Sequence, residues 1–171
     1  MSYRFTEELL KKGVSNMKVQ EVMTQDVKAC FPDTNLAAAA VLMWENDCGV
    51  LPVVVNGGNA VGVITDRDIA IALGTRGRAP QELRVDEVIQ GPVIACTLDD
   101  DVHTALKTMR KDKLRRLPVL NNEGELKGIL SINDVVLHAQ KGNKELDYDD
   151  VVSTFKAICE HPHLTVRSAA T

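Results

Sequence analysis

The sequence predicts an α/β protein made of two equivalent repeats, each with the order strand, helix, strand, strand, helix. The main observation is a duplicated stretch, GVITDRD at residues 62–68, which returns 66 positions later as GILSIND at residues 128–134. A second observation is an apolar stripe at helical spacing that is reproduced position for position. Its members are Leu36, Ala39, Ala40 and Met43 in the first half and Val102, Ala105, Leu106 and Met109 in the second. Because turns and caps also keep this register, we expect two halves related by a pseudo-twofold axis, with their sheets packed together.

Length and composition agree with a soluble pair of this kind. The chain has 171 residues, 44% of them hydrophobic, whereas a single unit of about 55 residues would bury too little surface to be stable alone. The net charge of -4 and the pI of 5.6 argue against broad binding to nucleic acids or anionic membranes. We find no apolar run near the roughly 20 residues of a membrane span, and no signal-peptide core in MSYRFTEELLKKG. A cytoplasmic location is therefore expected.

The chain is expected to divide into five segments: an appendage (1–17), a first repeat (18–75), a linker (76–84), a second repeat (85–141) and a tail (142–171). The appendage contains a short amphipathic pattern from Thr6 to Lys12 that predicts a helix. The linker is polar and is expected to be flexible. The tail predicts one helix from Asp149 to Glu160. One face of this helix is expected to pack on the module or on a second copy of the chain, and it consists of Val152, Phe155, Ile158 and Cys159.

Within each repeat the elements follow in the same order. A single helical turn (VQEVMT or VDEVIQ) precedes a short apolar strand that starts at Val27 or Val93. The next helix is predicted to open at Asp33 or Thr34 in the first repeat, and at Asp99 or Asp100 in the second. Two strands joined by a turn then complete the repeat. These strands are LPVVV and LPVL, followed by residues 61–64 and 126–130.

Each duplicated stretch reads as a strand that runs into a hydroxyl residue, Thr65 or Ser131, with Asp68 or Asp134 three positions later. Backbone N–H groups at a helix start have no intrahelical partner, so an anion or a polar ligand edge can bind there. The hydroxyl could bind a phosphate, and the carboxylate could accept both hydroxyls of a ribose. A helix capping box uses nearly the same pattern. Both interpretations are open at this point, and the repeat favours a ligand site in a cleft shared by both motifs.

Duplicated units with E-V-M-T near the start, then L-P-V and G-h-h-[ST]-x-x-D, resemble the cystathionine-β-synthase (CBS) domain family, arranged as a stand-alone tandem pair over about residues 18–141. The resemblance implies a regulatory module that binds AMP, ADP, ATP, NAD or S-adenosylmethionine between its repeats, forms a homodimer, and signals to a separate protein. It also implies roles for particular residues. Asp68 and Asp134 would hold ribose, Thr65 and Ser131 would contact ribose or phosphate, and Val27 and Val93 would flank adenine.

The two prospective sites differ in charge. Arg115 and Arg116 precede the LPV strand of the second repeat, whereas the first repeat has no cation there. An arginine fork makes bidentate contacts with phosphate, although a solvated charge pair is the alternative. In the first motif, Asp66 would repel phosphate unless Arg67 offsets it. We expect at least one working site.

Other constellations carry less weight. We find no acid–base partner for His103 or His138, so no catalytic residue and no enzyme activity are predicted. The segment from Cys159 to His163 offers only three metal ligands, and no metal or required cofactor is expected. The four cysteines have no CxxC spacing and are expected to be free thiols, with Cys30 and Cys96 as core residues. The alternative function is a nucleotide-free dimeric scaffold whose Thr/Ser-x-x-Asp motifs are only helix caps.

Overall fold

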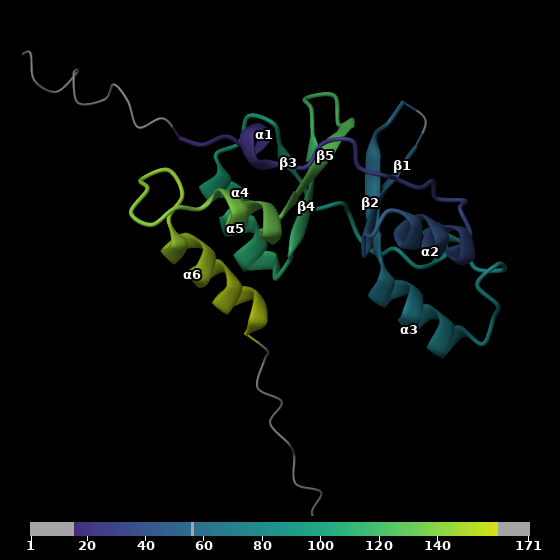
Figure 1. Cartoon of the computed structure of the whole chain (residues 1–171). Helices are drawn as coiled ribbons and strands as arrows, with labels where there is room; N and C mark the ends of the chain where they lie inside the picture. The colour runs from purple at the N-terminus through teal and green to yellow at the C-terminus, as the bar shows by residue number, and fades with distance from the viewer. Residues whose placement is uncertain (1–15, 56, 161–171) are drawn as a thin grey trace, which may run out of the picture.

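The computed structural model of the protein describes residues 16–55 and 57–160 (Figure 1). The first half contains the helices and strands α1 (Val19–Val22), α2 (Leu36–Glu45), β1 (Val50–Val54), β2 (Ala60–Thr65) and α3 (Asp66–Arg76). The second half contains η1 (Val85–Glu87), β3 (Cys96–Thr97), α4 (Val102–Asp112), β4 (Arg116–Leu120), β5 (Leu126–Ser131) and α5 (Ile132–His138), followed by α6 (Tyr148–Cys159). The predicted helix from Thr6 to Lys12 lies outside the described residues. The predicted α/β class and the duplicated element order are confirmed.

The two small sheets have the same register. Strands β1 and β2 pair antiparallel with Val50 opposite Thr65, and β4 and β5 pair with Arg116 opposite Ser131, which is the same pair shifted by one repeat. Strand β3 joins β4 in parallel, with Cys96 opposite Val119. In the first half the corresponding strand is reduced to a single bridge between Cys30 and Val53.

The strands predicted from Val27 and Val93 are therefore much shorter than expected. Only the last residue of the first segment, Cys30, reaches the neighbouring strand, with its N–H 3.0 Å from the carbonyl oxygen of Pro52. The residues before it leave the sheet, and Val27 instead lines a cavity between the two halves. In both segments only the cysteine at the end, Cys30 or Cys96, is buried, so the short apolar run does not form a full strand here.

Reciprocal hydrogen bonds show the pseudo-twofold relation between the repeats. The N–H of Ala60 donates to the carbonyl of Gly124 (3.2 Å), and the N–H of Leu126 donates to the carbonyl of Gly58 (2.9 Å). Each of these bonds becomes the other when residue numbers are shifted by one repeat. The two β-hairpin turns therefore meet each other, and the sheets lie side by side (Figure 1).

The opening turn of each repeat packs in the core of the other repeat. Val19 and Val22 of α1 belong to the apolar cluster that contains α4, β4 and β5. Val85 of η1 and Leu83 of the linker belong to the cluster of α2, β1 and β2. The linker, expected to be flexible, is held along the first half by buried Leu83 and by Arg78, which donates a 2.7 Å bond to Glu87 and lowers the pKa of that carboxyl. Each half thus completes the core of the other.

Helices α2 and α4 begin one or two residues later than predicted. Asn35 caps α2 by accepting from the N–H of Ala38 (2.9 Å), and Asp101 caps α4 by accepting from the N–H of His103 (2.7 Å). The predicted caps stabilise the preceding turns instead. The Thr34 hydroxyl accepts from the N–H of Phe31 (3.0 Å), and the Asp100 carboxylate from that of Thr97 (2.8 Å). Several polar residues in a row compete for the cap position, and the turn decides which one takes it.

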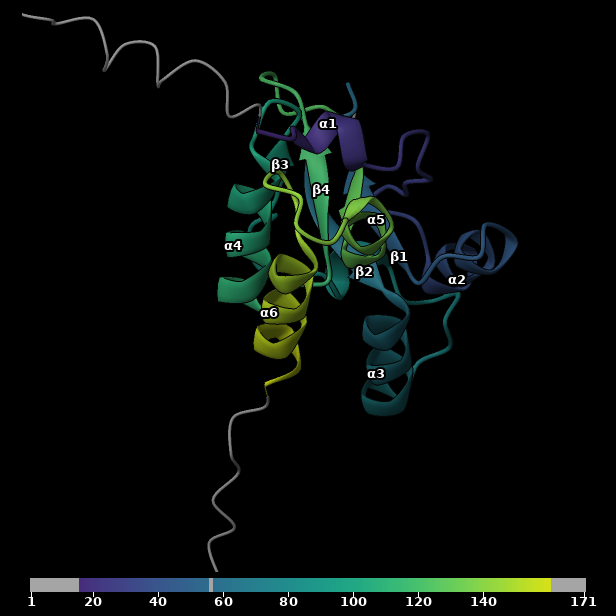
Figure 2. The ribbon, with the colours of Figure 1, turned by 60° about the vertical axis from the view of Figure 1, so that its left-hand side comes forward.

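Helix α6 packs against α4 and also contacts α5 (Figure 2). Its buried residues are Val151, Thr154 and Ile158, whereas Val152, Phe155 and Cys159 are exposed. Of the predicted face, only Ile158 packs on the module, and packing of the other three residues on a second copy stays a prediction. Polar Thr154 takes a place on the buried face because its hydroxyl donates to the carbonyl of Asp150 (2.7 Å) and accepts from Arg110 (2.9 Å). No helix in residues 16–55 and 57–160 is long and apolar enough to cross a membrane.

Candidate functional site

Both duplicated motifs form the same structure at a helix start. The Oδ2 atom of Asp68 accepts from the N–H (2.9 Å) and hydroxyl (2.7 Å) of Thr65. The Oδ2 atom of Asp134 accepts from the N–H (2.7 Å) and hydroxyl (2.6 Å) of Ser131. Each hydroxyl in turn accepts from the N–H of its aspartate, so both motifs are capping boxes. Only one carboxylate oxygen is used by each cap, and Oδ1 is left for another partner.

Asp134 lines a cavity of about 420 Å³ between the two halves. The second half contributes Ile129, Ser131 and Asp134 to this cavity, and the first half contributes Val27 and Pro52 among others. Apolar side chains and a carboxylate thus face one space. Such a combination can enclose a flat apolar ring and bind the hydroxyls of an attached sugar. We refer to this space as the Asp134 cleft.

The Asp134 cleft contains charges of both signs. Lys28 and Arg116 line it, together with the carboxylates of Asp26, Asp47 and Asp134. The exposed guanidinium of Arg116 comes from the start of β4. Arg115 is also exposed but is not among the residues that line the cleft, and its carbonyl accepts from the N–H of Ile132 (2.9 Å). The predicted pair of arginines is therefore split, and only Arg116 faces the cleft.

Asp68 lines a separate cavity of about 410 Å³, together with Val63, Thr75, Arg76 and Gln90 among others. The two motif carboxylates therefore do not share one space, as we expected from the sequence. Thr65 and Val93 line neither cavity. The guanidinium of Arg76 donates to the carbonyl of Glu87 (2.6 Å), the last residue of η1.

The difference between the cavities arises from the chain that follows each opening turn. Thr24 forms an antiparallel bridge with Ile129, with two N–H···O bonds of 3.0 Å, and its hydroxyl donates to Oδ1 of Asp134 (2.9 Å). The corresponding residue, Gln90, has no bridge to β2 among the described residues. Close packing here needs glycine, because a Cβ on Gly128 would lie 2.5 Å from the carbonyl oxygen of Thr24. Thr24 and Lys28 were missed by the sequence analysis: Thr24 ends the E-V-M-T motif, but the motif was not connected with the cleft, and nothing local marks Lys28.

Family comparison agrees with this geometry. The CBS-domain family matches residues 19–75 and again residues 85–141. The chain belongs to the CBS-domain family. The two matches coincide with the two halves of the fold, so this CBS pair contains both units of a tandem arrangement.

Relatives of this CBS pair include small proteins and larger enzymes. The protein MK0525 of Methanopyrus kandleri is 31% identical over 71% of this chain, and the match covers 62% of MK0525, which is less than two thirds. The protein YlbB of Bacillus subtilis is 30% identical over 74% of this chain and 85% of YlbB. Inosine-5'-monophosphate dehydrogenase of Mycobacterium tuberculosis is 33% identical over 67% of this chain, but the match covers only 21% of that enzyme.

Solved structures share the fold. The protein TA0289 of Thermoplasma acidophilum has a TM-score of 0.70 at 23% identity, covering 82% of this chain and 75% of that one. The CBS pair of MJ0100, in complex with 5'-methylthioadenosine and S-adenosylmethionine, has a TM-score of 0.65 at 23% identity, covering 71% and 94%. CBSX2, in complex with AMP, has a TM-score of 0.62 at 24% identity, covering 71% and 95%.

Away from the two cavities, the imidazole of His103 lies between two carboxylates, with Nδ1 3.1 Å from Oδ1 of Asp101 and Nε2 3.3 Å from Oδ2 of Asp150. The expectation that His103 has no acid–base partner is therefore wrong.

Cys30 and Cys96 are buried core residues, as predicted. Their burial raises the pKa of the Cys30 thiol to about 11 and that of the Cys96 thiol to about 12. Within residues 16–55 and 57–160, no group of three or more His, Cys, Asp or Glu side chains could hold a metal ion. His161 and His163, considered above with Cys159, lie outside the described residues.

Proposed function

We propose that this CBS pair binds an adenosine-containing ligand in the Asp134 cleft and acts as a regulatory module. The observation that carries the proposal is the carboxylate of Asp134, which is oriented by Ser131 and Thr24 and lines a cavity with apolar walls. A carboxylate held by its own cap is preorganised to accept ribose hydroxyls. Val27, Pro52 and Ile129 supply apolar surface for a purine. Two solved proteins of the same fold, MJ0100 and CBSX2, are in complex with adenosine compounds.

Ligand contacts are proposed residue by residue. Asp134 binds the ribose, Ser131 lies beside it, and Arg116 with Lys28 binds a phosphate. At the second cavity Asp68, whose carboxylate is held by the Thr65 cap, is the corresponding ribose ligand, and Arg76 is the nearby cation. Thr65 itself is proposed to act there only through this cap. Because the Asp134 cleft contains three carboxylates and two cations, a nucleoside monophosphate is favoured over a triphosphate there. Arg115 and Val93 are proposed to contribute only after rearrangement, since neither lines the Asp134 cleft or the cavity at Asp68.

Regulation by this module is part of the same proposal. The protein is proposed to be a cytoplasmic homodimer that passes the state of its cleft to a separate protein and has no catalytic activity of its own. In the dehydrogenase the matched segment is only 21% of the enzyme. This small share supports the proposal that a CBS pair serves as a regulatory unit beside a domain with another function. A ligand can shift the module only by its difference in affinity for two arrangements.

Calorimetric titration tests the ligand site. The unmodified protein is titrated with AMP, ADP, ATP, NAD, S-adenosylmethionine and adenosine, in parallel with thermal shift, since a saturating ligand raises Tm. Asp134→Asn keeps an acceptor for the Ser131 cap but loses the charge, so AMP affinity should fall about tenfold. Asp68→Asn is the matched control at the other motif and should have a smaller effect. Unchanged titration of Asp134→Asn would show that the ribose assignment is wrong.

The observed capping boxes also support the second candidate, a nucleotide-free scaffold. Both hydroxyl–carboxylate pairs already have partners within their own helices. If these two pairs are only helix caps, the double variant Asp68→Ala with Asp134→Ala should have a lower Tm, because two caps that each contribute about 1 kcal/mol to stability are lost. In that case no adenosine compound would raise the Tm of the unmodified protein. A Tm rise with any of them excludes the scaffold-only function.

A further inference from the structure

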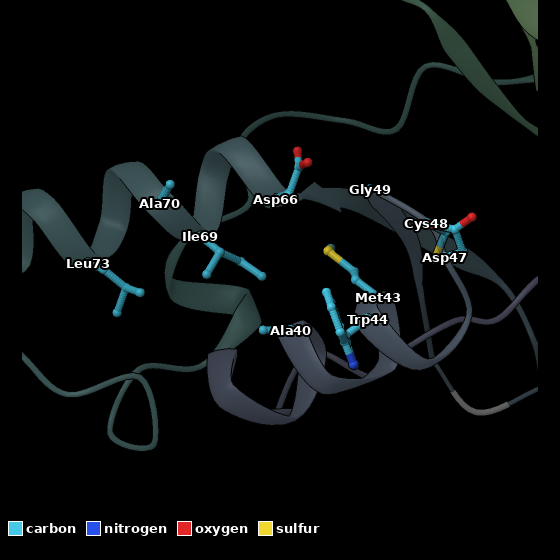
Figure 3. A pocket seen from close by; sticks show the side chains of 10 residues that line it. All are labelled: Ala40, Met43, Trp44, Asp47, Cys48, Gly49, Asp66, Ile69, Ala70 and Leu73. Atoms are coloured by element: carbon cyan, nitrogen blue, oxygen red, sulfur yellow. The ribbon is translucent and has the colours of Figure 1, made fainter.

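An apolar groove of about 500 Å³ lies between α2 and α3 in the first repeat (Figure 3). Met43 and Trp44 of α2 and Ile69 and Leu73 of α3 line it, with Asp47 and Asp66 at the rim. The exposed fraction of Trp44 is 88%, which is far above what an isolated large aromatic usually has. Helix α2 has no charged residue before Glu45, so its outer side is apolar as well. Such a face marks an interaction surface.

The second repeat shows what fits such a groove. Shifting by one repeat places the α2–α3 groove onto the space between α4 and α5, and α6 covers that space. Val151 and Ile158 of α6 join the same cluster as Leu106, Met109 and Val135. Within the described residues the first repeat has no equivalent of α6. Ala40 is exposed in the first repeat, whereas Leu106 at the same repeat position is buried under α6.

The charge at one rim position is reversed between the two grooves. In the second repeat Arg110 donates to Thr154 (2.9 Å), and Lys113 donates to the carbonyl of Glu160 at the end of α6. The corresponding residues of the first repeat are Trp44 and Asp47. Both Asp47 and Lys113 have a left-handed backbone, with φ of 46° and 54°. Asp47 and Lys113 therefore occupy equivalent positions with the same backbone conformation, but their side chains carry opposite charges.

We propose that the α2–α3 groove is the docking site for an amphipathic helix of a partner protein, with an apolar residue against Trp44 and a basic residue against Asp47. The lining contains Asp47 and Asp66 and no cation, which favours a basic helix. An acidic helix resembling α6 is disfavoured by the same carboxylates. The docked helix covers the apolar face as α6 covers the equivalent face of the second repeat.

The docking site and the ligand cleft share a wall. Asp47, Cys48 and Gly49 line both the α2–α3 groove and the Asp134 cleft. A ligand that moves this loop changes the affinity for the helix, and by linkage the helix changes the affinity for the ligand by the same factor. This coupling rests on the proposed function, whereas the groove itself does not.

Trp44 is the only tryptophan of the chain and therefore reports occupancy of the groove directly. The probe is a lactam-bridged helical peptide with the sequence of residues 147–160 carrying Thr154→Leu and Glu160→Lys, placed to face Trp44 and Asp47. The control peptide has the natural sequence, and Cys159→Ser is present in both. The basic peptide should shift Trp44 emission to the blue and bind about tenfold more tightly than the control peptide. Asp47→Lys, which copies Lys113, should weaken the basic peptide about threefold to tenfold and favour the control peptide.

Several results would overturn the docking proposal. Two of them are a Trp44 emission wavelength that does not change with the basic peptide, and emission shifts of equal size with both peptides. Sedimentation that shows a dimer dissociated by Trp44→Arg would assign the groove to a second copy of the chain. A red shift of Trp44 emission on deletion of residues 1–15 would assign it to the chain's own N-terminal segment.

The coupling is tested separately by repeating the peptide titration with saturating AMP, while calorimetry records AMP binding itself. A changed peptide affinity supports the coupling. If AMP binds and the peptide affinity stays the same, the coupling is wrong and the groove stands. If AMP does not bind, the proposed function fails at that ligand, and the docking result is unaffected.

Discussion

The hydroxyl of Thr24 donates a 2.9 Å hydrogen bond to Oδ1 of Asp134, across 110 positions of the sequence. Thr24 follows the opening turn of the first repeat, whereas Asp134 starts the last helix of the second. The bond therefore joins the two halves at the ligand cleft. It orients the carboxylate oxygen that the Ser131 cap does not use.

Replacing Thr24 by valine keeps its shape and removes this donor. Because the bond is exposed, we expect the free energy of unfolding to fall by only about 1 kcal/mol, measured by urea denaturation. AMP affinity should fall severalfold, since Oδ1 is no longer held. The matched control is Gln90→Leu, at the position where no bond to Asp68 exists among the described residues. Equal effects of the two variants would contradict the role given to Thr24.

The repeat offers a second matched pair in Gly128 and Gly62. A Cβ on Gly128 would lie 2.5 Å from the backbone oxygen of Thr24, whereas a Cβ on Gly62 would lie 2.8 Å from Cδ1 of Ile89, the end of a flexible side chain. Gly128→Ala should therefore lower the free energy of unfolding by about 2 kcal/mol, and Gly62→Ala by less than about 1 kcal/mol. Urea denaturation measures both. Gly128→Ala should also weaken AMP binding, because Thr24 must move away from β5.

Burial of two thiols predicts a pH dependence of stability. Burial raises the pKa of Cys30 from its ordinary value of 9.0 to about 11, and that of Cys96 to about 12. The folded state therefore keeps these protons while the unfolded state releases them. Their contribution to stability is complete below pH 9 and is lost as the pH rises through about 11 for Cys30 and about 12 for Cys96.

Urea denaturation at increasing pH checks this direction, with Cys30→Ala and Cys96→Ala as variants that should flatten the alkaline decline. Alkylation of the folded protein gives a second test. Mass spectrometry should find Cys159, which is exposed, modified well before buried Cys30 and Cys96. Rapid modification of either buried thiol would show that it is accessible in solution.

Elements with local signals could be predicted from the sequence. The capping boxes at Thr65 and Ser131 depend on residues three positions apart, and the duplicated hairpins depend on short turns. Comparing the two repeats extended these signals to the whole fold. Relations between distant segments were not predictable in the same way. Nothing near Thr24 indicates that it meets Asp134, and nothing near Val19 indicates that it packs in the core of the other repeat.

In the candidate site, too, some features were predicted from local signals and others were missed because they depend on distant segments. Asp134, Ser131, Val27 and Arg116 were predicted and do line one cleft. The separation of Asp68 into its own cavity was missed, because it results from the path of residues 88–90 after η1. Two segments that look equivalent in sequence diverge there: Thr24 bridges to β5, while Ile89 packs a side chain against Gly62.

The orientation of α6 supplies the last prediction. The buried face of this helix consists of Val151, Thr154 and Ile158, so it lies to one side of the apolar stripe and includes a polar residue, which periodicity alone could not select. The structure buries Ile158 (8% exposed) and leaves Phe155 at 37% exposed. Ile158→Ala should lower the free energy of unfolding by about 2 to 4 kcal/mol, since it opens a cavity against α4. Phe155→Ala, although it removes a larger side chain, should cost less than about 1.5 kcal/mol. Urea denaturation of both variants decides between the two faces: a larger loss with Phe155→Ala would mean that α6 packs through the face we first predicted, and that the template for helix docking on the first repeat has the wrong side.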